Sequence, residues 1–415
     1  MQKIKLLLVL FIGVFFMISC SDDNTTEPPN PTPTKTYKIG VLIPETGSGQ
    51  LNGQQSKASV EYAITDINNY FSVNNIKVRL QAIYKDSGTD SVQALAMLKE
   101  FADDTIKIVV GPYSSTTLTG LKHFADSAGI LLISHSAVSS TLAIEGDNIF
   151  RFVPDDKLQA KAIAKIMKED NKLVVIPLVR DDVWGRSLYS EVKEKLANSS
   201  VTLQVPIYYP PTQTNFSSIV QNIRSQIDNL EATFLKSEIG VYIISYGEGT
   251  NIMNHVSYFD DVMSVKFYGS SAYAWNSTLP ADEKAADAAV KTKLECPIMG
   301  FNENFKNVYS PLVERLRTKL LREPDSYALS VYDAAYVAGW TLARASDTVS
   351  INAIKDSVRL VLKTYSGMNG PIELDKNDDR INVTYDFMSL ILSDNVYKWQ
   401  TTAVYDTKTG VLTRK

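Results

Sequence analysis

The chain has 415 residues, of which 44% are hydrophobic and 21% are charged, and its formal net charge is -4. This length exceeds that of one ordinary core and predicts two or three domains of roughly 100 to 200 residues each. The weak negative charge argues against a nucleic-acid partner, because phosphate binding needs a basic face.

The first 20 residues differ from the rest of the chain. Lys3 and Lys5 precede an apolar run over 6–18, which is shorter than the roughly 20 residues that a membrane-spanning helix needs. The pattern predicts a signal peptide over 1–19. Residues 17–20 resemble a bacterial lipobox, which implies that Cys20 is acylated and becomes the first residue after cleavage. A plain secretory signal with an incidental Cys20 is the alternative.

Residues 21–35 hold four prolines, four threonines and no large apolar side chain. Such a segment cannot bury enough surface to fold, so we expect 20–36 to be a disordered tether. The acids directly after Cys20 resemble a signal that sends lipoproteins to the outer surface, although an ordinary leader also carries acids. We therefore expect a cell-envelope lipoprotein of the outer membrane, on its periplasmic or surface-exposed face. Cys296 is predicted to be a buried small hydrophobe.

Short β-branched runs alternate with segments of helical periodicity from residue 37 onward. Strands are predicted at 37–43, 78–84, 106–110, 130–134, 173–179, 201–208, 241–245 and 265–268. Helices are predicted at 54–70, 91–101, 116–128, 158–168, 187–197, 216–226 and 252–259. Continuous apolar strands between amphipathic helices are typical of parallel sheets covered on both faces. The predicted class is therefore α/β, doubly wound.

The second half of the chain departs from this alternation. The segment 150–156 interrupts it, and we interpret this as a first crossing between two lobes. A strand at 296–301 precedes two long predicted helices, at 304–321 and 325–344. The tail over 372–412 is rich in predicted strands separated by turn signals.

An ordered set of short motifs runs through the chain. It comprises 38–44, 46–49, Gly53, 86–90, 110–112 with 114–115, 133–134 with Ala137, 184–185, 322–328, 332–334 and 370–371. In this order they resemble the type I periplasmic binding proteins, and most closely the leucine/isoleucine/valine-binding branch that feeds ABC transporters.

The resemblance implies two doubly wound parallel-sheet lobes joined by three hinge crossings. Residues 37–154 and 303–380 would form the first lobe, and 155–302 and 381–415 the second. A small-molecule ligand would lie between them, at the carboxyl ends of the strands, where open α/β sheets bind ligands. The resemblance also implies an ABC permease as partner, and neither enzymatic activity nor a cofactor.

The segment 111–117 follows a predicted strand and opens a helix, so its backbone N–H groups and the helix dipole face the cleft. The hydroxyls of Ser114, Ser115 and Thr116 add donors, which predicts a cradle for a carboxylate or another anion. Helix capping is the alternative, because Ser and Thr are favoured at helix starts without any ligand. The family resemblance falls on Ser115.

Five further residues belong to the predicted ligand-binding site: Ser136, Trp184, Tyr246, Ser271 and Tyr327. The backbone of Ser136, in the turn after the strand at 130–134, is expected to contact the ligand. Trp184 matches the position of an aromatic lid in the family, Tyr246 ends another strand, and Tyr327 matches an aromatic position of the first lobe. Aromatic walls suit amphipathic ligands because they bury a large area with little rotamer entropy. Ordinary core packing is the alternative for Trp184 and Tyr246.

One position departs from the family. The resemblance implies an acid that pairs with the ligand's ammonium group, and Ser271 stands in its place. A buried ammonium without a counter-charge is costly. Glu248 is a candidate substitute from a neighbouring loop. The retained cradle and the missing acid predict a small organic acid, an amide or a modified amino acid as ligand.

Two other functions fit parts of the sequence. Gly47, Gly49 and Gly53 follow a strand and open a helix, which suggests a dinucleotide-dependent oxidoreductase. Against it, the acid expected about 20 positions further on is missing, and the nearest strand-end acid is Asp86. A ligand-sensing or scavenging lipoprotein without a permease would share the same fold. With three histidines and one mature cysteine, no metal site is predicted, and His135 is expected to be a loop residue.

Overall fold

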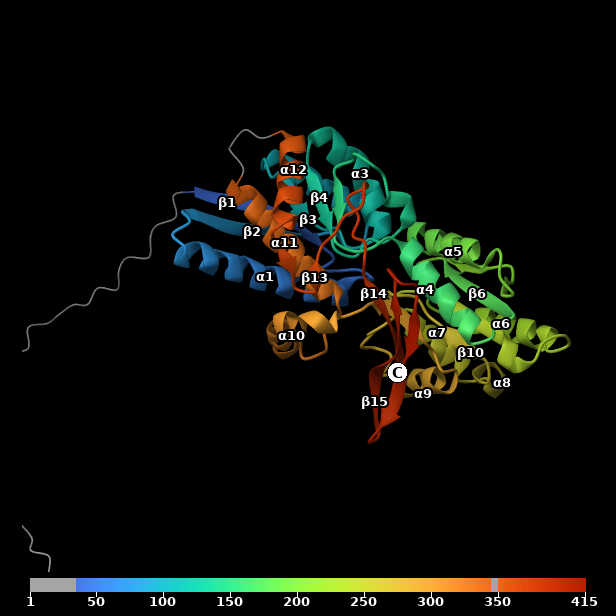
Figure 1. Cartoon of the computed structure of the whole chain (residues 1–415). Helices are drawn as coiled ribbons and strands as arrows, with labels where there is room; N and C mark the ends of the chain where they lie inside the picture. Colours follow the sequence, from blue (N-terminus) through green and yellow to red (C-terminus); the bar gives the residue numbers. More distant parts are fainter. Residues whose placement is uncertain (1–34, 345–349) are drawn as a thin grey trace, which may run out of the picture.

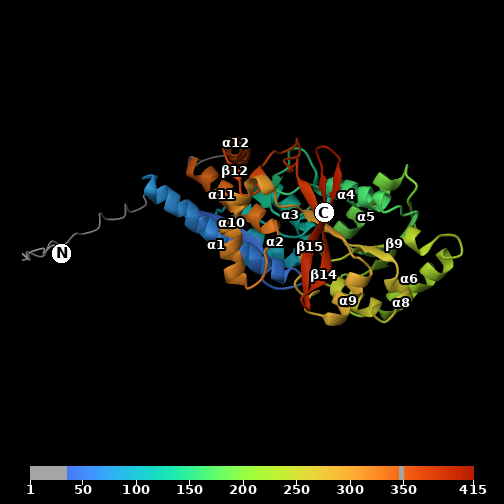
Figure 2. The same ribbon diagram turned by 60° about the horizontal axis from the view of Figure 1, so that its bottom comes forward.

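The computed structural model describes residues 35–344 and 350–415 (Figure 1). The predicted signal peptide, the predicted acylation site Cys20 and nearly all of the predicted tether lie outside the described residues. The described part forms two α/β lobes that lie side by side (Figures 1 and 2).

The first lobe is built on a parallel sheet with the strand order β2-β1-β3-β4-β5. Its strands are β1 (Lys35–Ile43), β2 (Val78–Asp86), β3 (Ile108–Val110), β4 (Leu131–Ser134) and β5 (Ile149–Arg151). The helices α1 (Gln50–Val73), α2 (Ser91–Asp103) and α3 (Ser115–Ala128) connect the first four strands. Their apolar side chains are buried because helices cover both faces of the sheet.

Three helices from much later in the chain return to this lobe. They are α10 (Lys306–Leu320), α11 (Tyr327–Arg344) and α12 (Ile351–Leu362), drawn in orange in Figure 1. Buried residues of all three share one core with β1, β3 and β4. The chain therefore passes between the lobes after β5, after β11 and before β14, as the predicted three crossings require.

The second lobe carries a parallel sheet with the strand order β10-β9-β6-β7, and β8 also pairs with β6. The strands are β6 (Val174–Arg180), β7 (Thr202–Leu203), β8 (Ile207–Tyr209), β9 (Ile239–Ile244) and β10 (Lys266–Tyr268). The helices are α4 (Asp156–Glu169), α5 (Val183–Leu196), α6 (Ser217–Leu230), α7 (Gly249–Val256), α8 (Asp260–Met263) and α9 (Glu283–Lys291).

The predicted elements meet this architecture with four differences. The predicted strand at 201–208 is two short strands, because Pro206 has no N–H for a continuous ladder. The interruption at 150–156 begins with a true strand, β5. The helices α8, α9 and α12 were not predicted. Lastly, the predicted strand at 296–301 is shorter, as β11 (Cys296–Met299), and it belongs to a separate antiparallel sheet.

This antiparallel sheet has the order β11-β14-β15-β16, with β14 (Thr384–Ser393), β15 (Val396–Asp406) and β16 (Leu412–Arg414). Met388 and Leu390 of β14 share a core with Cys296 and with the second parallel sheet. Cys296 is fully buried there, as predicted for a small hydrophobe. A two-stranded ribbon of β12 (Ser366–Gly367) and β13 (Gly370–Pro371) lies near α11.

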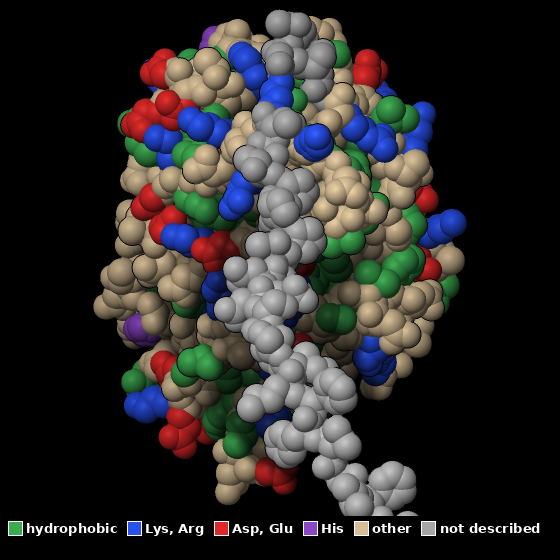
Figure 3. Space-filling model, turned by 90° about the vertical axis from the view of Figure 1, so that its left-hand side faces the viewer, with side chains coloured by type: hydrophobic (Ala, Val, Ile, Leu, Met, Phe, Trp, Pro, Cys, Tyr) green, Lys and Arg blue, Asp and Glu red, His purple; other side chains and the backbone are tan. Residues whose placement is uncertain are grey.

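Charges of both signs are intermixed on the visible part of the molecular face in Figure 3. Phosphate binding needs a basic face, and the part of this face that is visible is not uniformly basic. Among the described residues, no helix is long and apolar enough to cross a membrane.

Candidate ligand-binding cleft

A small enclosed cavity lies where loops of the two lobes meet. Its volume is about 20 Å³, and we call it the inner compartment. It is lined by Tyr113, Ser115, Ser136, Val138, Trp184, Tyr246, Ser271, Ala272 and Tyr327. The lining residues come from segments that follow β3, β4, β6, β9 and β10, and from the start of α11. The carboxyl ends of both parallel sheets therefore face one shared space.

A second cavity of about 60 Å³ adjoins the first, and we call it the outer compartment. The two share Tyr113, Tyr246, Ser271, Ala272 and Tyr327. The outer compartment adds Asn52, Arg322 and Asp325, among others. Both are far smaller than the roughly 300–1,000 Å³ of typical ligand sites, because the walls of the cleft contact one another.

Six of the eight predicted contact residues line the inner compartment: Ser115, Ser136, Trp184, Tyr246, Ser271 and Tyr327. The hydroxyl oxygen of Ser115 accepts a hydrogen bond from the N–H of Ser139 at 3.1 Å. The hydroxyl of Ser136 donates to the carbonyl oxygen of Tyr113 at 2.8 Å. These bonds connect the loops after β3 and β4, so the first-lobe wall is held as one unit.

Ser114 and Thr116 line neither compartment. Ser114 is the N-cap of α3, and its hydroxyl accepts from the N–H of Thr117 at 3.1 Å. The capping alternative therefore accounts for Ser114. The hydroxyl of Thr116 is buried without a hydrogen-bond partner among the described residues. Neither residue therefore lines the closed cleft, and their contact with the ligand stays a prediction.

Trp184 and Tyr246 form the aromatic wall of the second lobe. Their rings stack with centroids 4.8 Å apart and an interplanar angle of 6°. Trp184 is only 2% exposed, and its indole N–H has no hydrogen-bond partner among the described residues. A buried donor without a partner costs free energy, so this N–H is a candidate for contact with a ligand acceptor.

Among the described residues, no acid of the second lobe lines either compartment to replace the one missing at Ser271. The N–H of Ser271 donates to the side-chain oxygen of Gln159 at 2.8 Å. Glu248 lines neither compartment, and its carboxylate accepts from Arg180 at 2.6 Å and from the hydroxyl of Tyr209 at 3.0 Å. Arg180 thus already compensates its charge. The idea that Glu248 takes over as counter-ion is not supported by this geometry.

Tyr113 and Asp325 are two of the cleft residues that were not predicted. Tyr113 lines both compartments, and its hydroxyl is bonded by the amide of Asn52. Asp325 lines the outer compartment, and its carboxylate accepts from the amide of Gln55 at 2.6 Å and from the N–H of Tyr327 at 3.0 Å. Burial raises the pKa of Asp325. In the sequence, Tyr113 lies between the matched residues 110–112 and 114–115, while an acid before a helix looks like a cap.

The glycine pattern that suggested a dinucleotide site has a structural explanation. A Cβ on Gly53 would lie 1.7 Å from the carbonyl oxygen of Pro44, and Gly47 has a φ of +81°. The carboxylate of Asp86 accepts from the N–H of Glu45 at 2.8 Å, so it fixes the turn that follows β1. Partial burial raises the pKa of Asp86, but the hydroxyl of Thr46 and nearby N–H groups outweigh it and lower the pKa.

His135 is buried behind the cleft, where its Nε2 lies 3.0 Å from the hydroxyl of Ser56. Burial lowers the pKa of His135 to about 3, so the ring is neutral. It follows β4 directly, as expected for a loop position, but it is part of the core. Within the described residues, no group of three or more His, Cys, Asp or Glu side chains is placed to hold a metal ion.

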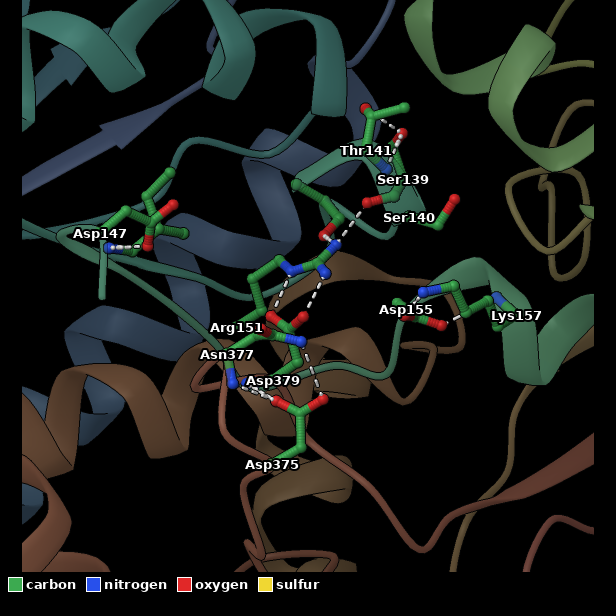
Figure 4. A network of polar contacts seen from close by, with 12 residues as sticks. Ser139, Ser140, Thr141, Asp147, Arg151, Asp155, Lys157, Asp375, Asn377 and Asp379 are labelled. Atoms are coloured by element: carbon green, nitrogen blue, oxygen red, sulfur yellow. Dashed lines mark hydrogen bonds and ion pairs between the residues drawn. The ribbon is translucent and has the colours of Figure 1, made fainter. Parts of the chain in front are cut away.

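The hinge side of the cleft is organised by Arg151 (Figure 4). Its guanidinium donates to the carboxylate of Asp379 through two nitrogens and to the carbonyl oxygens of Ala137 and Ser139 at 3.2 and 2.7 Å. The same side chain therefore holds both a hinge segment and the loop that carries Ser136.

Two α/β lobes that close on aromatic rings and hydroxyl groups define a class of small-molecule binding proteins. The sequence matches the family described as periplasmic binding protein over residues 36–394, and the chain belongs to that family.

Two relatives illustrate how far the sequence similarity extends. The leucine-, isoleucine-, valine-, threonine- and alanine-binding protein of Pseudomonas aeruginosa is 25% identical over 46% of this chain and 51% of its own length. The chain thus spans about half the length of that relative. An uncharacterized protein of Methanocaldococcus jannaschii is 24% identical over 98% of both chains.

Solved structures share the fold. The branched-chain amino acid transporter substrate binding protein of Streptococcus pneumoniae, in complex with isoleucine, has a TM-score of 0.70 at 17% identity and covers 89% of this chain and 99% of its own. A solute binding protein of Rhodopseudomonas palustris in complex with 3,4-dihydroxybenzoic acid has a TM-score of 0.72 at 16% identity, with 90% and 98% covered.

Proposed function

We propose that this chain is a lipid-anchored solute-binding protein of the cell envelope. Its two lobes close on a small polar ligand that carries a carboxylate or amide group, and the loaded protein delivers the ligand to an ABC permease. The observation that carries the proposal is that Trp184 lines the inner compartment together with Ser115 and Ser136, and that its indole N–H is buried without a hydrogen-bond partner among the described residues.

The chemistry of the inner compartment supports an acceptor-rich ligand. The hydroxyl of Ser115 and the indole N–H of Trp184 are available hydrogen-bond donors, and the dipole of α3 favours negative charge near Ser115. The rings of Tyr113 and Tyr246 offer flat apolar walls. A carboxylate with a compact apolar body satisfies both features. Structures of the same fold are known with isoleucine and with hydroxybenzoic acids.

The lobes would move as rigid bodies around the hinge. In this proposal residues 37–154 and 303–380 form one body, and 155–302 and 381–415 form the other. Ligand enters an opened cleft, because the closed compartments are smaller than any amino acid. Small-angle scattering should detect a smaller radius of gyration with saturating ligand than without it.

A thermal-shift screen tests the ligand class. Amino acids, organic acids and amides are compared at equal concentration, and a ligand at 100 times its dissociation constant should add about 2.7 kcal/mol to the unfolding free energy. We expect carboxylates and amides among the hits. A screen in which only sugars or bases stabilise the protein would contradict the proposal.

The anchor is tested separately. In the proposal Cys20 carries lipid and 21–35 forms the spacer, so Cys20→Ala should move the protein from the membrane fraction to the soluble fraction. Retention of the variant in the membrane would disprove the anchor without affecting the ligand assignment.

A further inference from the structure

The outer compartment contains one cationic side chain among the described residues that line it, Arg322. The guanidinium is partly buried and donates one hydrogen bond, to the carbonyl oxygen of Leu51 at 2.5 Å. No carboxylate of the described residues forms an ion pair with it, and burial lowers its pKa. A guanidinium has five N–H donors, so most of its capacity at this wall is available.

The two acids close to Arg322 in the sequence accept hydrogen bonds from other residues. Glu323 accepts from Arg317 at 2.7 Å. Asp325 accepts from the amide of Gln55 and the N–H of Tyr327, and it influences Arg322 only through space. A partly buried charge without a direct partner is costly, and such charges are concentrated at binding sites.

We propose that the outer compartment is a subsite for a second anionic group of the ligand, bound by Arg322. The inference rests on the proposed function, because the first carboxylate is the one placed at Ser115 and Trp184. The two compartments share five lining residues, so a single compact ligand spans both. The ligand class is then a small dianion, such as a dicarboxylate, which a planar guanidinium binds through two parallel hydrogen bonds.

The test compares matched pairs of ligands by isothermal titration. Butyrate, pentanoate and benzoate carry one carboxylate, while succinate, glutarate and terephthalate carry a second one on a similar body. We expect at least one dicarboxylate to bind the wild type about tenfold more tightly than its monocarboxylate. Arg322→Gln should reduce this ratio to below about threefold, and Arg322→Lys, which keeps the charge, should give an intermediate ratio.

Arg224→Gln is the matched control. Arg224 lies on α6 and forms an exposed ion pair with Asp261, so the substitution removes the same charge far from the proposed subsite residue. It should leave the ratio at the wild-type value. If monocarboxylates bind but a second carboxylate never improves the affinity, or if the improvement survives Arg322→Gln, the subsite is wrong and the proposed function stands. If none of these acids binds, the subsite is wrong, and the thermal-shift screen over amino acids and amides decides the proposed function separately.

Discussion

Arg151 and Asp379 form a buried ion pair that joins two of the segments through which the chain passes between the lobes (Figure 4). Their side chains are 0% and 3% exposed. The backbone reinforces the pair, since the N–H of Arg151 donates to the carbonyl of Asp378 at 3.0 Å and the N–H of Arg380 donates to the carbonyl of Arg151 at 2.9 Å. The hinge is thus rigid where it meets the first lobe.

Asp379→Asn should therefore destabilise the protein strongly. The substitution leaves the guanidinium of Arg151 buried without its counter-charge, which costs about 3–5 kcal/mol in comparable sites. Urea unfolding at pH 7 measures the loss. Arg224→Gln, in an exposed pair, should cost only about 0–1 kcal/mol. A loss below about 1 kcal/mol for Asp379→Asn would mean that the pair is dispensable.

Trp184→Phe separates the role of the indole N–H from that of the ring. Phenylalanine can still stack on Tyr246, but it cannot donate a hydrogen bond. The best ligand of the screen should bind about tenfold more weakly, because one hydrogen bond contributes roughly 1 kcal/mol and more when the acceptor is charged. Titration calorimetry measures the change. Equal affinity in the variant would assign Trp184 to packing alone.

The sequence predicted the residues of the inner compartment better than those of the outer compartment. Trp184 and Ser271 lie far apart in the chain, but both follow parallel strands of one sheet, and the ends of such strands meet at one edge. Arg322 and Asp325 could not be predicted in the same way. Their roles depend on Leu51 and on the amide of a residue in α1, and no local pattern encodes those contacts.

Local sequence patterns also predict only part of the fold. The parallel sheets follow from alternating apolar strands and amphipathic helices, whose periods are visible in single segments. The antiparallel sheet pairs β11 with β14, and no periodicity distinguishes this pairing from an extension of the parallel sheet. The helix α12, in contrast, has local signals in the sequence. It is amphipathic, and Ser350 directly before it is a typical helix N-cap.

Asp333 should make stability depend on pH. This carboxyl is fully buried on α11 and accepts from the hydroxyl of Tyr365 at 2.5 Å and from the N–H of Met368 at 2.9 Å. Burial raises its pKa to about 6. Between about pH 4 and 6 the folded state then binds more protons than the unfolded state, so stability falls as the pH rises through this window.

Asp333→Asn should flatten this dependence by on the order of 2–3 kcal/mol across the window. Urea unfolding between pH 4.5 and 7.5 gives the slope for each variant. Asp261→Asn is the control, because the hydrogen bond from Arg224 outweighs partial burial and lowers the pKa of Asp261, so its effect falls below this window. An unchanged slope in Asp333→Asn would show that other buried acids account for the pH dependence.

Ser140 should stabilise the closed cleft without contacting the ligand. Its hydroxyl donates to the carboxylate of Glu191 at 2.6 Å, and its N–H donates to the hydroxyl of Ser187 at 3.2 Å. Ser140 lies in the turn η1 (Ser140–Leu142) of the first lobe, whereas its partners lie on α5 of the second. These bonds cross the cleft and would break if the lobes separated.

Ser140→Ala should therefore weaken binding of the best ligand by about fivefold to tenfold, since a hydrogen bond to a charged group contributes on the order of 1–2 kcal/mol. The loss should fall on the dissociation rate, measured by stopped-flow tryptophan fluorescence, because the bonds form only once the cleft has closed. Thr141→Ala removes a neighbouring hydroxyl whose partner, Ser139, lies in the same lobe, and it should leave the rate unchanged. If both variants release ligand at the wild-type rate, the contacts between η1 and α5 do not hold the lobes together, and closure depends on the ligand and the aromatic wall.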